Sequence, residues 1–565
     1  MSQASGLKSK TPATSWENGL LAGNGEMGVI VLGDPNKDTV FTNHEMLYEP
    51  LGFEHISPPD IAFALPKTQA LLLSGQYKEA KDFQIKTLAD NGLKELIWTD
   101  PYHPGPSFQI EQKKYGTNTN YQRSINFDTG EIAINWQDDL GSWQRKTFVS
   151  RDNNTIIQQF EGSKPTNRTI TFIDNKTVNP KIIGHKGALK LKTPSLSLNK
   201  QWIVFRQAYQ LYGRGYEVIT KITHQDGKIV VEQPNKLHLK AVTSATLLTK
   251  IIPLDDFSQS KVSEAKAQLS TIKLPYQSLL NAHSKIHGEL FKRLSLSLNG
   301  SKSPVIFTED LLEKQRLSPD KLNVQLLELM FNMGRYTLIS SSGKLPPNLY
   351  GLWAGFWRPQ WSGDFTLNAN VNLQVSSAAT GQLPEVINSY LNMIDVISPD
   401  WETNAKNLLG VSGYLSPSRT SGRRGYQVHT SSKWTGHGWT GGAQWLLLPA
   451  IEYYLTTLDE EYLRTRIMPH LEKIALFYEE FLTLEDKTGH YIFAPSFSPE
   501  NRPLNQESMY VVNATQDIAA AKEALTYAIT FSNKLKINQD KIVIWQNLLR
   551  KMPRYLINED GALAE

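Results

Sequence analysis

The sequence contains no cysteine. This absence excludes a disulfide framework, a thiolate zinc site and a cysteine nucleophile, and it leaves the redox compartment undecided. A surplus of one charge sign is also lacking: 59 basic and 55 acidic residues give a formal net charge of +4. No Lys/Arg tract has the density that follows phosphates or anionic lipid. We therefore expect neither nucleic acid nor a membrane surface as a partner.

Long apolar runs are missing as well. The N-terminal stretch "MSQASGLKSKTPATSW" lacks the apolar core of a signal peptide, and no later run approaches the length of a membrane span. The compartment therefore stays open, with a secreted or periplasmic location expected only if a signal peptide has been removed. The oligomeric state is equally open.

The chain is rich in aromatic residues. With 565 residues it should hold more than one domain. Many of its 13 Trp, 22 Tyr and 21 Phe residues lie in polar, glycine-rich segments. Exposed rings of this kind suit stacking on sugar faces, although a place in the core is the commoner fate of an aromatic side chain.

The segment "GNGEMG", residues 23–28, has the G-x-G-x-x-G spacing of a dinucleotide-binding loop. Such a loop follows a strand and opens a helix, so that the helix N-terminus faces the phosphate. Here the β-branched run "VIVLGD" follows, and no clear strand precedes. We expect a turn into a β-strand, with glycine where φ is positive or backbones approach closely.

The first half of the chain, residues 16–274, alternates short strand patterns with turns. Strand patterns begin at Glu131, Trp143, Asn154, Arg168, Gln201 and Lys228. This spacing predicts an N-terminal β-sandwich. Residues 61–89 show helical periodicity and predict a helical insertion.

From Tyr276 onward the periodicity becomes helical. Amphipathic helices are predicted over residues 276–294, 320–342, 383–397, 442–455, 462–482, 514–531 and 541–552, and residues 295–312 are predicted as a loop. Helical hairpins with long decorated loops predict an α/α toroid of the six-hairpin barrel type. The predicted domains are a β-sandwich over residues 12–275, a helical linker over 276–320 and a catalytic toroid over 321–565.

Three loops carry a family likeness. They are "KLPPNLYGLWAGFWRPQWSGDFTLNANVNLQ" (344–374), "GYQVHTSSKWTGHGWTGGAQW" (425–445) and "IFAPSFSPENRP" (492–503). They resemble glycoside hydrolase family 95, whose members include α-L-fucosidases and α-L-galactosidases, with "NAN" and "PSFSPEN" as the most specific motifs. "WENGLLAGNGEMGVIVLG" and "WQRKTFVS" resemble the family's N-terminal β-domain, so the likeness spans most of the chain. It implies that residues 23–28 form a structural turn beside the catalytic toroid.

The residues themselves suit glycoside hydrolysis by inversion, which needs a general acid and, on the opposite face of the sugar, a base that activates water. Glu500 follows a proline in a loop with Ser496 and Ser498. We expect its neighbours Phe493 and Phe497 to raise its pKa by enclosing it. The resemblance places the general acid on the same residue. The alternative is a surface carboxylate that caps a turn.

Asn368 and Asn370 match the paired asparagines that hold the attacking water in the family. On an extended segment alternate side chains point the same way, so both amides could reach one water. An amide cannot accept the proton, and the resemblance places the base in a C-terminal segment that has no counterpart here. We therefore expect the barrel to be incomplete at its C-terminus. Asp364 and Asp517 are the candidate bases within the chain, and Asp517 has the alternative role of a helix cap.

The predicted substrate-binding residues are Trp353, Trp361, Trp439, His429 and Asn372. The indoles could stack on a pyranose, and His429 matches a family histidine that contacts sugar. Trp357 and Trp434 lie in the same kind of loop. The alternatives are tryptophans that cover the barrel mouth and a loop histidine satisfied by protein.

Metal binding is not predicted. His429 and His437 lie eight residues apart in a glycine-rich loop, which is poor ligand spacing without a carboxylate partner. We expect no metal and no cofactor.

The function predicted from these residues and from the resemblance is removal of an α-linked terminal sugar, fucose-like or L-galactose-like, from an oligo- or polysaccharide by an inverting mechanism. One alternative is a lyase acting on an acidic glycan, with His429 and Asn370 at the uronate and with Arg419, Arg423 and Arg424 lining the cleft. The other is a carbohydrate-binding relative without catalysis. No residue distinguishes fucose from galactose.

Overall fold

The computed structural model describes residues 6–298 and 306–564. The chain forms two compact units, each assembled from separate segments. The β-unit comprises Met1–Leu51, Pro101–Gly363 and Gly381–Val386. The helical unit comprises Gly52–Asp100, Asp364–Thr380 and Ile387–Glu565. Part of the loop predicted over residues 295–312 lies outside the described residues.

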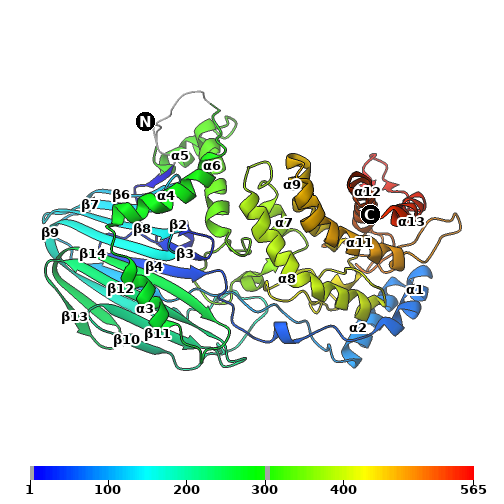
Figure 1. The fold of residues 1–565 in the computed structure, drawn as a ribbon, viewed down its shortest axis with the longest axis horizontal. Coiled ribbons are helices and arrows are strands. Elements are labelled where there is room, and N and C mark those ends of the chain that lie inside the picture. Colours follow the sequence, from blue (N-terminus) through cyan, green and yellow to red (C-terminus); the bar gives the residue numbers. More distant parts are fainter. Residues whose placement is uncertain (1–5, 299–305, 565) are drawn as a thin grey trace. The chain divides into compact units, whose positions relative to one another are not determined.

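The β-unit is built on one antiparallel sheet of 14 strands within the described residues, in the order β1-β6-β7-β8-β9-β14-β12-β11-β10 along its main path (Figure 1). The hairpins β2-β3-β4-β5 join this path through β9, and β13 joins it through β14. The bounds are β1 (Gly6–Ser9), β2 (Leu20–Gly23), β3 (Met27–Val31), β4 (Lys37–His44), β5 (Ser107–Gln112), β6 (Thr119–Asn126), β7 (Glu131–Gln137), β8 (Ser142–Ser150), β9 (Thr155–Ile173), β10 (Ser195–Leu198), β11 (Trp202–Ala208), β12 (Gly215–Gln225), β13 (Lys228–Glu232) and β14 (Lys236–Leu254).

Two long strands, β9 and β14, belong to both halves of this sheet. The first part of β9 pairs with β8 and its last part pairs with β5, while β14 follows it with register shifts between Leu239 and Ser244. The strand patterns at Asn154 and Arg168 therefore belong to one strand. The rings of Phe172 on β9 and Phe205 on β11 lie 5.3 Å apart, so apolar side chains of the two halves meet. This is the packing of the predicted β-sandwich.

The segment at residues 23–28 is the turn of the β2–β3 hairpin, so a strand does precede it. Asn24 Oδ1 accepts the backbone N–H groups of Glu26 and Met27 at 3.0 and 2.8 Å. A Cβ at Gly28 would lie 2.7 Å from the indole nitrogen of Trp353. The close approach of that ring explains the glycine, and the prediction of a structural turn is confirmed.

Of the described α-helices, four lie wholly in the β-unit: α3 (Val262–Thr271), α4 (Tyr276–Lys292), α5 (Thr308–Leu317) and α6 (Val324–Ser341). Leu269 of α3 and Leu279 of α4 pack with Phe148 and Ile157 of the sheet in one apolar cluster. The predicted helices at 276–294 and 320–342 are thus confirmed. Helix α5 begins in the segment predicted as a loop, residues 295–312, and extends beyond it. Only Leu311 of α5 is buried, so its apolar periodicity is weak.

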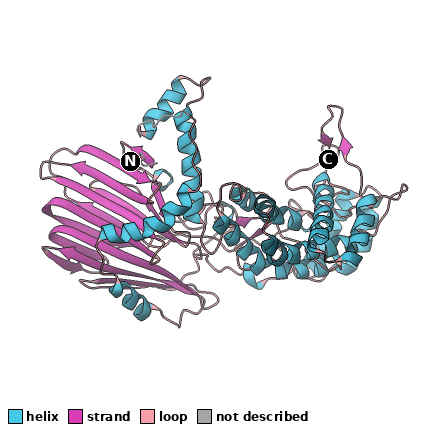
Figure 2. Cartoon of the chain, turned by 45° about the horizontal axis from the view of Figure 1, so that its top comes forward, coloured by secondary structure: helices cyan, strands magenta, loops and turns pink. Residues whose placement is uncertain are grey.

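The helical unit contains α1 (Leu65–Leu73), α2 (Tyr77–Asp90), α7 (Asn370–Val375), most of α8 (Pro384–Leu409), α9 (Gly442–Thr457), α10 (Glu460–Tyr462), α11 (Met468–Phe481), α12 (Thr515–Leu535) and α13 (Gln539–Arg550). Tyr454 on α9 meets Phe531 on α12 edge to face at 5.1 Å, and Trp545 on α13 donates to Glu479 on α11 at 2.8 Å. An N-terminal β-domain followed by packed helical hairpins is the fold class predicted (Figure 2).

The predicted helical insertion exists as the α1–α2 hairpin, but it belongs to the helical unit. Gln69 donates to the carbonyl of Ala494 at 3.0 Å. Leu72 and Ala80 share an apolar cluster with Ala494 and Tyr510. The hairpin therefore packs beside the start of the loop that carries Glu500.

In the described ranges, none of the helices is long and apolar enough to span a bilayer.

Candidate active site

Parts of the loops singled out by sequence, residues 364–374, 425–445 and 492–503, meet within the helical unit. Strand β15 (Phe365–Thr366) pairs with β16 (Arg419–Thr420), which places the "NAN" segment beside the arginine-rich loop. Directly after this pairing, Leu367 N–H donates to the carbonyl of Ser418 at 2.8 Å. The two strands hold the turn that contains Asn368.

Glu500 stands at the tip of a tight turn. The turn is closed by Asn501 N–H, which donates to the carbonyl of Ser498 at 2.6 Å. The Glu500 side chain is exposed, whereas Phe493 and Phe497 are fully buried. The apolar enclosure that the sequence led us to expect is therefore absent, because these rings point into the core instead of around the carboxyl.

Asn368 and Glu500 contact each other directly. Asn368 Nδ2 donates to Glu500 Oε1 at 3.2 Å, joining segments 132 residues apart. The Asn368 side chain is only 8% exposed. Its backbone carbonyl accepts the indole N–H of Trp445 at 2.8 Å, which fixes the turn against α9.

Asn370 is placed differently from the prediction. The segment is not extended through both asparagines, because α7 begins at Asn370 and Asn368 lies in the preceding turn. Val371 and Val375 are buried on one face of α7, a helical spacing that the short segment concealed. Asn370 is exposed at the helix start, while Asn368 is buried.

Asn372, one turn further, is 3% exposed. Its Nδ2 donates to the carbonyl of Trp445 at 3.3 Å, and its Oδ1 is buried without a partner among the described residues. This side chain ties α7 to α9 and does not present its amide to an open surface.

His429 is buried and neutral. Its Nδ1 lies 2.9 Å from the carbonyl of Ile97, and its ring meets Trp98 edge to face at 4.8 Å. Burial, helped by the positive charge of Arg419, lowers the pKa of His429 to about 3. Because a carbonyl can only accept, Nδ1 carries the hydrogen and Nε2 is an acceptor.

Asp364, the first candidate base, is fully buried and already bonded. It accepts hydroxyl hydrogens from Thr99 at 2.6 Å and Thr366 at 2.8 Å, and Arg419 Nη1 lies 3.5 Å away. Burial raises the pKa of this carboxyl, and the arginine opposes the rise. The arrangement is a buried ion pair that braces β15 and β16.

The other two arginines of this loop are also paired. Arg423 lies 3.7 Å from Glu54, and Arg424 lies 3.4 Å from Asp400 and donates to the Tyr426 hydroxyl. A cleft that binds an acidic glycan would need cations free to face the ligand. With a carboxylate beside each arginine, the observation that favoured a lyase is weakened.

The tryptophans divide into buried and exposed rings. Trp439 is fully buried and donates to Gln516 at 3.0 Å, and Trp353 in the β-unit is 5% exposed and donates to the Ala22 carbonyl at 3.0 Å. Burial favours the alternative in which these two rings cover other groups instead of stacking on sugar. Trp361, also in the β-unit, is 50% exposed. Trp357 is fully buried and Trp434 is half-buried.

Two residues that sequence reasoning missed shape this region, Trp98 and Trp445. Trp98 lies under Arg419, whose guanidinium carbon is 4.9 Å from the ring, and beside His429. Nothing local indicates that a segment following the α1–α2 hairpin reaches these loops. Trp445 was part of a predicted apolar helix, where its position directly after a glycine-rich loop was the only available signal.

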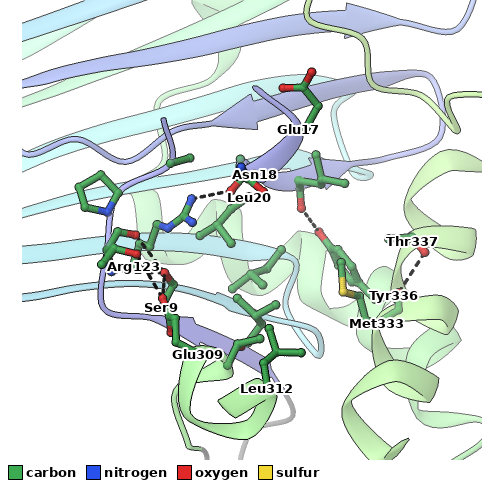
Figure 3. Close-up of a pocket in the computed structure, with 18 of the residues that line it drawn as sticks. Ser9, Glu17, Asn18, Leu20, Arg123, Glu309, Leu312, Met333, Tyr336 and Thr337 are labelled. Carbon is green, nitrogen blue, oxygen red and sulfur yellow. Dashed lines mark hydrogen bonds between the residues drawn. The ribbon is translucent and has the colours of Figure 1, made fainter. Parts of the chain in front are cut away.

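Two of the cavities in the described part of the chain are considered as candidate sites, one in each unit. One of about 800 Å³ lies in the helical unit beside Trp445, Gln516, Glu523 and Tyr527. The other, of about 560 Å³, lies in the β-unit and holds none of the predicted site residues (Figure 3). There Arg123 donates to the carbonyl of Asn18 at 2.8 Å, and Glu309 accepts from Ser9 at 2.6 Å. Within the described ranges, no group of three or more His, Cys, Asp or Glu side chains is arranged to hold a metal ion.

Two sequence families match the chain. Residues 275–565 match the glycosyl hydrolase family 95 catalytic domain, and residues 7–252 match the glycosyl hydrolase family 65 N-terminal domain. The N-terminal β-domain and the helical region that follows it are thus the domains of a glycoside hydrolase. The chain belongs to glycoside hydrolase family 95.

The similar proteins are distant. The chain is 25% identical to "Alpha-L-fucosidase 2" of Arabidopsis thaliana, over 98% of this chain and 68% of that protein. It is 24% identical to "Probable alpha-fucosidase A" of Aspergillus niger, over 85% of this chain and 61% of that protein. Among solved structures, a putative kojibiose phosphorylase from the human microbiome matches with a TM-score of 0.55 at 10% identity, over 99% of this chain and 72% of that one. That likeness concerns the fold alone.

Proposed function

We propose that this protein removes an α-linked terminal sugar, fucose-like or L-galactose-like, from an oligo- or polysaccharide with inversion at the anomeric carbon. The proposed catalytic domain is residues 321–565. The observation that carries the proposal is the 3.2 Å contact between Asn368 and the exposed carboxyl of Glu500. The α-fucosidase names of the relatives support the class of sugar.

In this proposal Glu500 is the general acid. Its carboxyl protonates the glycosidic oxygen as the bond to the anomeric carbon breaks. Asn370, exposed at the start of α7, is proposed to hold the water that attacks from the opposite face, whereas Asn368, which contacts Glu500, is proposed to orient the acid. The water must lose its proton to a carboxylate, and Asp364 and Asp517 are both buried and bonded to protein groups. The proposal assigns the role of base to neither of them.

Sugar binding is proposed for His429 in the helical unit and, as a separate prediction for the β-unit, for Trp361. The Nε2 lone pair of His429 can accept a hydrogen bond from a sugar hydroxyl, and its low pKa keeps it an acceptor throughout the neutral range. Trp361 offers a half-exposed indole face of the kind that stacks on a pyranose. Trp353, Trp439 and Asn372 act in this scheme by packing, since their side chains are buried.

The test is Glu500→Gln, assayed on two substrates that differ in leaving group. We expect a loss of about 10²–10⁴-fold in kcat/KM on a natural glycoside, whose leaving group needs a proton. The loss should be far smaller on an aryl glycoside with an acidic phenol, which departs without one. Glu507→Gln is the matched control, because Glu507 is an exposed glutamate in the same loop. Equal activity of Glu500→Gln and wild type on the natural glycoside would overturn the acid assignment.

The product separates this proposal from its alternatives. Proton NMR during the first minutes of reaction should show a free sugar of inverted anomeric configuration. An unsaturated product that absorbs in the ultraviolet would establish a lyase. Saturable sugar binding without turnover, for both substrates, would establish a non-catalytic relative.

A further inference from the structure

Asp517, near the start of α12, has a structural environment that neither a base nor a helix cap would have. We propose that Asp517 is a positioning residue that holds the loop carrying Glu500 in its working place. The inference rests on the proposed function of Glu500. It assigns Asp517 no contact with substrate.

The carboxylate of Asp517 binds two loops at once. Its Oδ2 accepts from the hydroxyl of Ser496 at 2.6 Å and from the backbone N–H of Phe497 at 3.0 Å. Its Oδ1 accepts the backbone N–H of Gly441 at 2.6 Å. Asp517 is fully buried, so these bonds form away from water, where they are strong.

Ser496 is held from three further directions. Its backbone exchanges two hydrogen bonds with Val511, at 2.9 and 3.0 Å, and its hydroxyl oxygen accepts the N–H of Ala514 at 3.0 Å. Ser496 is therefore the fixed point of the loop. Only three residues separate it from Glu500, and the turn closed by Ser498 and Asn501 limits their freedom.

The second loop held by Asp517 also borders the candidate site. Gly441 follows the segment with Trp434 and Trp439, and the Trp434 ring meets Phe497 edge to face at 5.7 Å. A Cβ on Gly441 would lie 3.0 Å from Asp517 Oδ1, so the glycine allows this close approach. One carboxylate thus sets the spacing between the Glu500 loop and the loop beside it.

The same bonds argue against the two earlier interpretations. A general base needs a carboxylate oxygen open to the attacking water, whereas both oxygens of Asp517 already accept hydrogens from protein and the side chain is fully buried. A cap would bond the first turn of its own helix. The N-cap residue of α12 is Ala514, and the bonds of Asp517 leave the helix for the two loops.

The informative substitution is Asp517→Asn, which keeps the size of the side chain. An amide places NH₂ where one acceptor oxygen stood, so it must face at least one N–H or O–H donor and one of the two loops is released. A displacement of about 1 Å in a catalytic group can cost on the order of 10²-fold in rate. We expect kcat on a natural glycoside to fall by roughly 10–100-fold, with KM changed less than threefold.

The leaving-group comparison tests positioning against mere structural damage. If Asp517 acts through Glu500, Asp517→Asn should lose much less activity on the aryl glycoside with an acidic phenol, as Glu500→Gln does. Ser496→Ala removes one donor to Asp517 and should give the same pattern at a smaller amplitude. Asp540→Asn, an exposed aspartate in the first turn of α13, is the matched control and should behave as wild type.

The outcomes separate the inference from the proposed function. If Glu500→Gln shows the leaving-group pattern but Asp517→Asn and Ser496→Ala retain wild-type kcat, the positioning role is wrong and the acid assignment stands. If these two variants lose activity equally on both substrates, Asp517 is structural only, and the positioning role is again wrong. If Glu500→Gln itself has no effect, the proposed function fails first, and the inference fails with it.

Discussion

Asp38 and Glu49 in the β-unit and Asp517 in the helical unit are buried carboxylates with different kinds of partner. In the β-unit Asp38 lies 3.0 Å from Arg145, and Glu49 accepts two bonds from Arg358 at 2.8 and 2.9 Å. In the helical unit Asp517 is equally buried, yet its bonded donors among the described residues are a hydroxyl and two backbone N–H groups. Asp38 and Glu49 face a cation, as Asp364 does in the helical unit, whereas Asp517 faces neutral hydrogen-bond donors.

The kind of partner indicates which structural role each buried carboxylate has. A carboxylate paired with an arginine joins two side chains, and either partner alone would be an uncompensated charge in the core. A carboxylate that binds backbone N–H groups joins two loops largely through their backbones, as Asp517 does. The price is that no cation offsets its desolvation, and burial raises the pKa of Asp517 to about 7.

The largest expected effect comes from breaking a pair in the β-unit. Glu49→Gln leaves the buried Arg358 without its counter-charge, and we expect the free energy of unfolding to fall by about 3–5 kcal/mol. Urea unfolding measures this loss. The double variant Glu49→Gln with Arg358→Met should regain much of it, because it removes both charges. A loss below about 1 kcal/mol for the single variant would show that Arg358 finds other compensation.

The next effect concerns Asp517 and pH. Its pKa is about 7 in the folded protein, above the ordinary 3.8, so the folded state holds a proton that the unfolded chain releases. The stabilisation is full below about pH 4 and is lost as pH rises to about 7, in all about 4 kcal/mol. Asp517→Asn should remove this part of the pH dependence of the melting temperature. Parallel pH profiles for variant and wild type would contradict the expectation.

Buried histidines should make stability fall with decreasing pH, which is the opposite direction, by about 1–2 kcal/mol each between about pH 8 and pH 5. Burial lowers the pKa of His103 in the β-unit and of His429 in the helical unit to about 3. Each contributes stability that is present above about pH 6.5 and is lost as pH falls toward 3. His103→Gln and His429→Gln should therefore melt less differently from wild type at pH 5 than at pH 8. A difference that grows on acidification would refute the assignment of neutral rings.

The smallest effect is expected for a pair at the surface of the helical unit. Lys473 on α11 lies 2.8 Å from Glu402 on α8, and both side chains are more than 40% exposed. A double-mutant cycle with alanine should give a coupling of about 0.2–1 kcal/mol that shrinks further in salt. A coupling as large as that of Glu49 and Arg358 would remove the contrast between buried and exposed pairs.

Local sequence patterns predicted the positions of helices and strands better than the pairing between them. The strand patterns at Asn154 and Arg168 were correct, but their union in β9 depends on pairing with β5 and β8, which no alternation of side chains reveals. Helix α5 was missed because its burial is slight, and the start of α7 was missed because six residues are too few to establish a period.

The candidate site shows the same limit. Glu500 and Asn368 were predicted from motifs, and their contact joins residues 132 apart, a distance at which periodicity carries no information. The role of Asp517 could not be predicted at all. At its position in a helix the local rule suggests a cap, whereas the donors that bind it come from two other loops.

The contact of the α1–α2 hairpin with the Glu500 loop also bears on the order in which the chain is synthesised and folds. Its partner Ala494 lies 425 residues after Gln69. Protein synthesis at about 5–20 residues per second separates the two by roughly 20–85 s. During this interval Leu72 and Ala80 have none of their partners Ala494 and Tyr510 to cover them. The apolar surface of the α1–α2 hairpin that packs against the Glu500 loop is therefore synthesised early. It stays uncovered until the loop itself has been translated.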